Sequence, residues 1–264
     1  MVLTVDIGNT SITVGLYGPD GQLQCTAALD TAPGRTRDGC AVDLVNVLRL
    51  RGAEPRDVDG AILSCVVPPL EAAMAGALEL LTGRRPLIVG PGIRTGLNIR
   101  SDLHNQLGSD IVAASVAALA RYPSPCIVVD LGTATTFSLL KDGVYEGCAI
   151  LPGVRLGLEA LARGTAELPH ISLAPPPGVL GRNTVDAMRA GILFGAAGAV
   201  DGLIDRFEAA CGSPAAAVVA TGGCAPPVLP HCRRTLIHDP NLLLDGLYLL
   251  YRKNAKPAEK HRKA

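Results

Sequence analysis

The sequence contains no tryptophan, and aromatic residues make up only 3% of its 264 residues. Because proteins that bind single-stranded nucleic acid stack its bases on aromatic side chains, this scarcity argues against such a surface. Net charge is also missing, since 24 Lys and Arg residues balance 24 Asp and Glu residues. Nothing electrostatic indicates a polyanion, and we expect no nucleic-acid partner.

Neither a signal peptide nor a membrane-spanning run is indicated. The first apolar run has no charged segment before it and is interrupted by Asp6. The longest smooth apolar stretch, residues 111–120, is too short to cross a bilayer. We therefore expect a cytoplasmic protein with no membrane partner.

The eight cysteines include no Cys-x-x-Cys pair, and several lie inside apolar runs, where a thiol behaves as a small hydrophobic group. Cys224, His231, Cys232 and His238 form the one group that suggests a metal site. Their spacing fits no structural zinc pattern, so we expect none there.

What the sequence does contain is a repeat. MVLTVDIGNTSITVGLY opens the chain, and PCIVVDLGTATTFSLL follows at 125–140. Each reads as a strand that ends in Asp-x-Gly and turns into a second strand, and a third strand follows at 22–29 and at 144–150. Two unrelated hairpins are the alternative, but the shared Asp-x-Gly favours duplication.

Helices and strands alternate after each three-strand segment, as apolar periodicity and Gly or Pro boundaries indicate. The first half continues with a helix near 41–48, a strand at 61–67, a helix at 69–81 and a strand at 86–90. The second continues with helices at 156–164 and 184–209, a strand with its glycine turn at 216–223, a strand at 234–239 and a helix at 242–254. The pattern predicts an α/β fold with two halves, 1–115 and 116–254, each a mixed sheet covered by helices, and a disordered basic tail at 255–264.

The two Asp-x-Gly turns suit phosphate binding. We expect Gly8 and Gly132 to permit unusual φ angles and a close approach of an anion to the backbone. The hydroxyl groups of Thr10, Ser11, Thr133, Thr135 and Thr136 add donors. Asp6 and Asp130 would repel phosphate unless each holds a cation that bridges to a nucleotide. One such turn is an ordinary hairpin, but the pair predicts a clamp for ATP.

A buried strand followed by Gly222 and Gly223 adds room for a ring or a ribose against the backbone. Several motifs occur in order with these turns: DIGNT, G-x-D at 108–110, D-x-GTATT, G-x-A-I-x-PG, G-x-NT, ATGG and DPNL. Together they resemble the type III pantothenate kinases, members of the actin-like ATPase superfamily with two ribonuclease-H-like halves. The resemblance runs from about residue 2 to residue 254.

The resemblance implies ATP-dependent phosphorylation of pantothenate to 4'-phosphopantothenate, the first step of coenzyme A biosynthesis, by a homodimer that uses Mg²⁺ and potassium or ammonium. It implies that Asp130 binds the monovalent cation, that Asp6 holds Mg²⁺ through water, and that Asp110 is the proton acceptor. The ATP-binding residues would be Asp6, Ile7, Gly8, Asn9, Thr10, Ser11, Ile12, Thr13, Thr133, Gly222 and Gly223. The pantothenate-binding residues would be Gly108, Ser109, Asp110, Ile111, Thr184 and Arg182.

The residues around Asp110 are compatible with that role. Ser109 stands where an N-cap belongs, and Asp110 falls in the first turn of an apolar helix, where the helix N-terminus stabilises a carboxylate. Such a group can accept a proton from an attacking hydroxyl, although Asp is also common in first turns for structural reasons. Thr184 has two interpretations as well, as the cap of the long helix or as a substrate contact.

The match breaks at four positions: His104 replaces the usual Pro, Ile111 the usual Arg, Ser138 an acid and Cys148 a Gly. An isoleucine cannot bind the carboxylate of pantothenate or the transferred phosphoryl group as a guanidinium can. Arg155 and Arg182 lie in expected loops and are candidates to compensate. Two alternatives therefore stay open: a paralogue that binds nucleotide and acts as a regulatory or accessory protein, and a kinase for another small hydroxyl compound.

Overall fold

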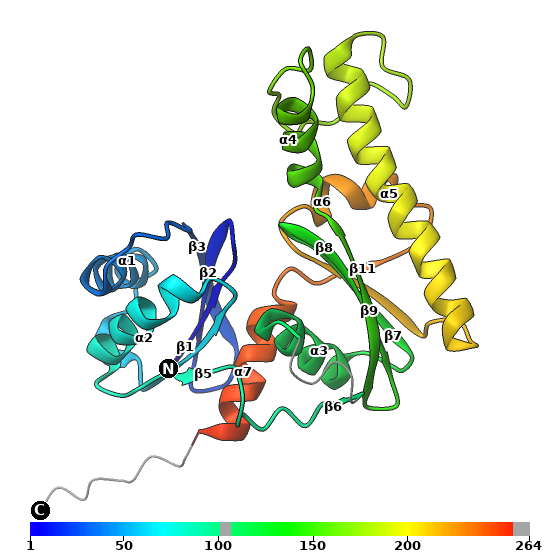
Figure 1. Ribbon diagram of the computed structural model, residues 1–264. Coiled ribbons are helices and arrows are strands. Elements are labelled where there is room, and N and C mark those ends of the chain that lie inside the picture. Colours follow the sequence, from blue (N-terminus) through cyan, green and yellow to red (C-terminus); the bar gives the residue numbers. More distant parts are fainter. Residues whose placement is uncertain (101–106, 256–264) are drawn as a thin grey trace, which may run out of the picture. The chain divides into compact units, whose positions relative to one another are not determined.

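A computed structural model describes residues 1–100 and 107–255 of the chain. His104 and all but the first residue of the expected basic tail lie outside the described residues. The chain forms two compact units (Figure 1), and each is described by itself. Unit 1 comprises Met1–Gly96, Gly108–Val116 and Leu243–Ala264; unit 2 comprises Leu97–Leu107 and Ala117–Leu242.

Unit 1 is built on a five-stranded mixed sheet with the order β3-β2-β1-β4-β5. Its strands are β1 (Val2–Ile7), β2 (Ser11–Tyr17), β3 (Leu23–Asp30), β4 (Gly60–Cys65) and β5 (Leu87–Ile88). The first three pair antiparallel as a meander, whereas β4 pairs parallel with β1, and β5 with β4. A parallel partner requires a crossover, which the helices supply.

Helices cover both faces of this sheet (Figure 1). Helices α1 (Arg37–Leu50) and α2 (Pro68–Thr82) pack on the face that carries Leu3, Val5 and Ile7. The short η1 (Pro55–Asp57) lies between α1 and β4 in the chain. The other face receives α7 (Leu242–Asn254), whose Leu244 approaches Gly15. Side chains alternate between the two faces of a strand, so Asp6 belongs to the face opposite α1 and α2.

Helix α7, which chain order alone would group with the second half, packs in unit 1. The Tyr17 hydroxyl donates a buried 2.6 Å hydrogen bond to Asp245, and the rings of Tyr17 and Tyr248 stack with centroids 4.3 Å apart. A Cβ atom at Gly246 would lie 1.8 Å from the carbonyl oxygen of Ala113 in α3 (Ser109–Arg121). Only glycine therefore allows α7 to lie this close to the start of α3.

Unit 2 repeats the plan of unit 1. Its sheet has the order β11-β10-β7-β8-β9-β6, and β9-β8-β7-β10-β11 corresponds to β3-β2-β1-β4-β5 with the same parallel and antiparallel pairings. The strands are β7 (Cys126–Leu131), β8 (Ala134–Lys141), β9 (Val144–Pro152), β10 (Ala217–Thr221), β11 (Ile237–His238) and β6 (Asn98–Ile99). The predicted fold class, two mixed sheets flanked by helices, is confirmed, and so is the repeated module. The extra strand β6 was not predicted.

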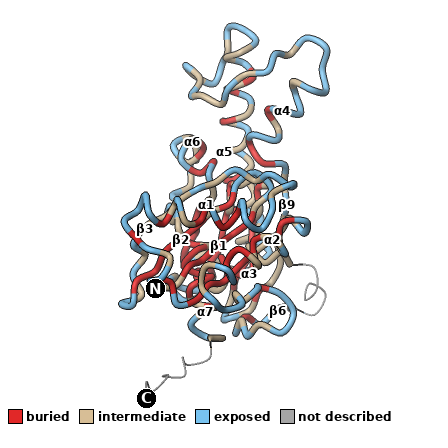
Figure 2. The backbone as a smooth tube through the Cα atoms, turned by 90° about the vertical axis from the view of Figure 1, so that its left-hand side faces the viewer, coloured by how far each residue is buried: buried red, intermediate tan, exposed pale blue. Residues whose placement is uncertain are grey.

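Unit 2 contains the end of α3 from Ala117 on, α4 (Val154–Gly164), α5 (Thr184–Cys211) and α6 (Ala225–Val228), followed by η3 (Leu229–His231). The core joins Ile127 and Val129 of β7 to Leu193 and Val200 of α5. Helix α5 is long and apolar enough to cross a membrane by length and composition alone, and 33% of its most apolar window is buried. Buried residues concentrate in the strands, whereas the segment between α4 and α5 is mostly exposed (Figure 2).

Candidate active site

The first Asp-x-Gly turn connects β1 to β2 in unit 1. Asp6 is 8% exposed, and the sheet register places it beside Thr13 of β2 and Ser64 of β4. Asn9, Thr10 and Ser11 are exposed at the tip of the turn. The turn therefore presents a buried carboxylate at its base and exposed polar groups at its tip.

The reason for glycine in this turn differs from the prediction. Gly8 and Gly132 do not have positive φ angles, so the expected unusual φ is wrong for both. A Cβ atom on Gly8 would instead lie 3.1 Å from the carbonyl oxygen of Ser11, to which the Gly8 N–H donates at 3.0 Å. Because this N–H is used inside the turn, donors for a phosphate group must come from the tip.

Helix α3 brings Asp110 into the same unit. Ser109 is the first residue of α3 and not its N-cap as predicted, because its hydroxyl group contacts β4: it lies 2.9 Å from Ser64 Oγ and accepts from the Cys65 N–H at 3.2 Å. Asp110 accepts a 2.8 Å hydrogen bond from the Ile111 N–H through Oδ1. Ile111, which stands where the family has an arginine, thus still donates its backbone N–H to the Asp110 carboxylate.

Sequence reasoning missed Ser64 and Cys65, although a polar pair inside the apolar run AILSCVV was a visible signal. Burial raises the pKa of the Cys65 thiol and is the largest cause. A hydrogen bond from the Val67 N–H lowers this pKa, whereas the charges of Glu71 and Asp6 raise it further. We therefore expect Cys65 to stay a neutral, weakly nucleophilic thiol near the first turn.

The second Asp-x-Gly turn, which connects β7 to β8, is packed closely against the residues that follow β10. Asp130 lies beside Thr221 of β10 and opposite Thr136 of β8. Gly222 follows β10 with a φ of 90°, and a Cβ atom there would lie 2.4 Å from Asp130 Oδ1 and 2.5 Å from the carbonyl carbon of Leu131. The ATGG glycine is therefore required by both backbone conformation and close approach.

Gly153, at the start of α4, closes the same turn from the other side. Its N–H donates to the carbonyl oxygen of Thr133 at 3.1 Å, and a Cβ atom would lie 2.1 Å from that oxygen and 2.5 Å from the Gly132 oxygen. Sequence reasoning did not give Gly153 a role, although it belongs to the quoted Pro-Gly run. By contrast, no atom lies within 4 Å of the Cβ position of Gly223, which leaves open space beside the turn.

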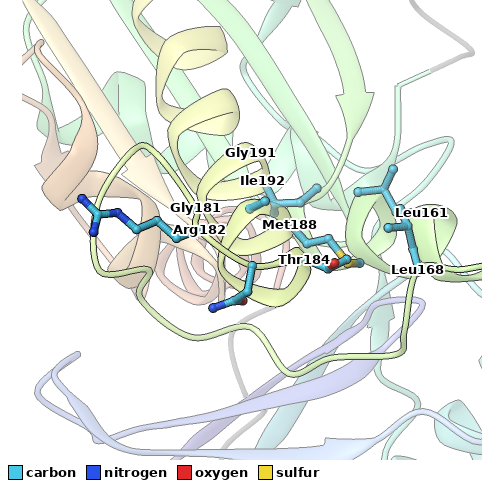
Figure 3. A pocket seen from close by; sticks show the side chains of 10 residues that line it. Leu161, Leu168, Gly181, Arg182, Thr184, Met188, Gly191 and Ile192 are labelled. Atoms are coloured by element: carbon cyan, nitrogen blue, oxygen red, sulfur yellow. The ribbon is translucent and has the colours of Figure 1, made fainter.

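Thr184 and Arg182 lie elsewhere in unit 2, at the start of α5. Asn183 is the N-cap of α5, since its side chain accepts from the Asp186 N–H at 2.9 Å, so the alternative that Thr184 caps this helix is wrong. Figure 3 shows Thr184 and Met188 facing a cavity, whereas Arg182 extends away from it. The cavity has a volume of about 720 Å³ and is lined by Leu161, Leu168, Gly181, Arg182, Asn183, Thr184, Ala187, Met188, Gly191 and Ile192.

Ser138, which departs from the family pattern, and the two arginines that could compensate for the missing guanidinium lie in unit 2. Ser138 is buried, and its hydroxyl group lies 3.1 Å from that of Tyr145, so it serves the packing of β8 against β9. Arg155 lies in the first turn of α4 and not in a loop as predicted, whereas Arg182 does lie in a loop. Both arginines are exposed.

The structure therefore gathers the expected site residues into three groups. The first turn, Ser109 and Asp110 lie in unit 1; Asp130, Thr133 and Gly222 lie together in unit 2, with Gly223 adjacent; Arg182 and Thr184 lie at the start of α5.

Comparisons with known proteins identify the family and the fold of the chain. The family model described as type III pantothenate kinase matches residues 2–206. A type III pantothenate kinase from Listeria monocytogenes is 41% identical over 261 residues, which is 98% of this chain and 100% of the relative. In fold, the chain is similar to component A of (R)-2-hydroxyglutaryl-CoA dehydratase from Acidaminococcus fermentans (TM-score 0.58, 14% identity, 95% and 96% of the two chains). It is equally similar to the activator of 2-hydroxyisocaproyl-CoA dehydratase from Clostridium difficile, solved with bound ADPNP (TM-score 0.58, 12% identity, 95% and 93%).

Proposed function

The chain belongs to the type III pantothenate kinase family, and we propose that it transfers the terminal phosphoryl group of ATP to pantothenate. The products are ADP and 4'-phosphopantothenate, so the reaction is the first step of coenzyme A synthesis. The observation that best supports an enzyme is Asp110, a half-buried carboxylate in the same unit as the first phosphate turn. A module that only binds nucleotide has no evident need for it.

Asp110 is proposed to accept the proton of the pantothenate hydroxyl group. The hydroxyl oxygen forms a bond to the γ-phosphorus as the bond from that phosphorus to the β,γ-bridging oxygen breaks, and ADP leaves with the bridging electron pair. A carboxylate within hydrogen-bond reach of the hydroxyl suffices, because phosphoryl transfer depends mainly on positioning and charge stabilisation.

The two turns are proposed to bind the nucleotide. Polar groups from Asn9 to Ser11 and the exposed Thr133 suit phosphate oxygens, and the open space beside Gly223 suits the adenosine. Among the described residues, no group of three or more His, Cys, Asp or Glu side chains could hold a metal by itself. This fits Mg²⁺ bound by one carboxylate, Asp6 through water, together with ATP phosphates, and Asp130 is a suitable oxygen ligand for potassium or ammonium. Bound Mg²⁺ would neutralise phosphate charge.

The acceptor is proposed to contact Gly108, Thr184 and the backbone of Ser109, whose hydroxyl group contacts β4. The side chain of Ile111 cannot bind an anion, and Arg182 is the cation we propose to replace the missing guanidinium, because it is exposed and adjoins the cap of α5. In its observed rotamer Arg182 extends away from the cavity, so this role requires the side chain to rotate. We also propose that the enzyme is cytoplasmic.

We propose a homodimer that uses the exposed apolar surface of unit 2. Leu156 of α4 is 47% exposed, and Val179 and Leu180 of the following loop are 64% and 84% exposed. Val179 and Leu180 are adjacent in the chain, and exposed apolar side chains that lie together are typical of interaction surfaces. The double variant Val179→Glu and Leu180→Glu is expected to sediment as a monomer. Leu50→Glu in unit 1, at an equal 84% exposure, is the control that should leave the dimer intact; a monomeric wild type contradicts the proposal.

The test of the function is ATP consumption with a panel of acceptors. We expect consumption that depends on pantothenate, Mg²⁺ and potassium, with sodium as the control for ionic strength. Pantothenate should exceed other small hydroxyl compounds at equal concentration. Consumption supported by a different acceptor would identify a kinase of altered specificity. ATP binding with background consumption for every acceptor would instead support the accessory protein.

A further inference from the structure

We propose that the hydroxyl groups of Ser64 and Ser109 act together as a positioning device for Asp110. They fix the first turn of α3 against the end of β4, and the Asp110 carboxylate follows directly on that turn. The inference rests on the proposed role of Asp110 as the proton acceptor and adds two positioning residues to it.

The contact between the two elements is concentrated on one hydroxyl group. Ser64 is fully buried in β4, and its Oγ lies 2.9 Å from Ser109 Oγ. The Ser109 hydroxyl also accepts from the Cys65 N–H at 3.2 Å and lies 3.4 Å from the Cys65 carbonyl oxygen. A hydroxyl has one proton and two lone pairs, so these contacts use most of its bonding capacity.

This use of Ser109 is unusual for a serine at the start of a helix. A serine there commonly satisfies one of the exposed N–H groups of the first turn. In α3 the Val112 N–H donates to the Gly108 carbonyl oxygen at 3.1 Å, and the Ile111 N–H donates to Asp110. The Ser109 side chain is thereby left to bind the strand, which makes it a tertiary anchor.

The Asp110 carboxylate lies over the same turn. Gly108 leaves room for it, because a Cβ atom on residue 108 would lie 2.3 Å from Asp110 Oδ1. The Ile111 N–H donates a 2.8 Å hydrogen bond to that oxygen and orients the carboxylate on the turn. The place of the carboxylate therefore depends on where β4 holds the turn.

The anchor also relates Asp110 to the first phosphate turn. Ser64 is the register partner of Asp6 in the parallel pair of β4 and β1, so the two side chains lie on one face of the sheet. The end of β4 is further tied to β1 by a 3.0 Å hydrogen bond from Val66 N–H to the Ile7 carbonyl oxygen. Ser64 and Ser109 thus complete a path of direct contacts from the Asp6 strand to the Asp110 turn.

Loss of the anchor should affect the chemical step more than binding. A shift of about 1 Å in a catalytic group can cost about a hundredfold in rate. We expect Ser64→Ala and Ser109→Ala each to lower kcat by at least about tenfold at saturating ATP and pantothenate. The dissociation constant of ATP should stay within about twofold, since neither hydroxyl belongs to a phosphate turn.

A double variant and two further substitutions distinguish positioning from general damage. The double variant Ser64→Ala and Ser109→Ala should be no slower than the slower single variant, because each substitution removes the same contact between the two hydroxyl groups. Ser109→Thr keeps the hydroxyl group and should recover most of kcat. Ser115→Ala is the matched control: Ser115 is a buried serine on α3 that has no hydrogen-bond partner within the described part of the chain.

The outcomes separate this inference from the function on which it rests. Wild-type enzyme without pantothenate-dependent turnover overturns both. Wild-type turnover with kcat unchanged in both alanine variants overturns the inference alone. A fall in kcat matched by equal losses in Ser115→Ala and in Ser109→Thr, or by a parallel loss of ATP binding and melting temperature, also overturns it, because the serines would then serve stability only.

Discussion

Replacing Asp110 with asparagine is expected to reduce kcat for pantothenate phosphorylation by about a thousandfold. The amide keeps the shape of the carboxylate and can still accept from the Ile111 N–H, so α3 should remain in place. What is lost is a group that can take the hydroxyl proton as the oxygen attacks phosphorus. The measurement is steady-state turnover at saturating substrates, with ATP binding followed by calorimetry.

Asp38→Asn is the matched control for this variant. Asp38 also lies in the first turn of a helix in unit 1, where it pairs with Arg37 at the surface. It should retain wild-type turnover, and both variants should retain ATP affinity. Turnover of Asp110→Asn within about threefold of wild type would exclude Asp110 as the proton acceptor.

Replacing Gly222 with alanine is expected to lower the free energy of unfolding by at least about 2 kcal/mol and to weaken ATP binding by more than about tenfold. The new Cβ atom would meet Asp130 Oδ1 at 2.4 Å and the Leu131 backbone at 2.5 Å, in a backbone conformation that alanine rarely adopts. Relief of these contacts must move Asp130 or the end of β7. Thermal unfolding and calorimetry with ATP measure the two effects.

Two other glycines of unit 2 separate the causes. Gly147→Ala in β9 is the control for stability, because its Cβ position meets no atom within 4 Å and its φ is not positive. Gly223→Ala should also keep the free energy of unfolding. A loss of ATP affinity in that variant would therefore come from contact between the new methyl group and the bound nucleotide. Gly222→Ala with unchanged unfolding and unchanged ATP affinity would contradict the account of the second turn.

Much of this fold was predictable because its signals are local. The Asp-x-Gly repeat and the apolar periodicities predicted the strand meanders and most helices, and the shared strand order of the two sheets confirms the repeat. The two-residue strand β6 was missed because Asn98–Ile99 does not lie in an apolar run, whereas the equally short β5 and β11 lie in the runs PLIVG and RTLIHD. The place of α7 depends on the distant contact of Tyr17 with Asp245, which no local pattern reveals.

The family was predictable from the sequence, whereas the physical reasons for two residues of the candidate site were not. The comparisons confirm the resemblance to type III pantothenate kinases that the ordered motifs indicated. The roles of Asp6, Asp110, Asp130 and Thr184 stay predictions. Close approach, not unusual φ, explains Gly8, and a strand contact, not capping, explains Ser109. The Ser109 contact joins residues 45 apart in the chain, which no local pattern reveals. The Gly8 contact is local, but it depends on the geometry of the turn, which the residue types alone do not give.

The most direct test of the central claim is a single-turnover reaction of the wild-type chain with γ-labelled ATP, pantothenate, Mg²⁺ and potassium. The account predicts that the label moves to pantothenate, and that it stays in ATP when Asp110→Asn replaces the wild type. Label that remains in ATP bound to the wild-type enzyme, or that appears only as inorganic phosphate, would contradict it.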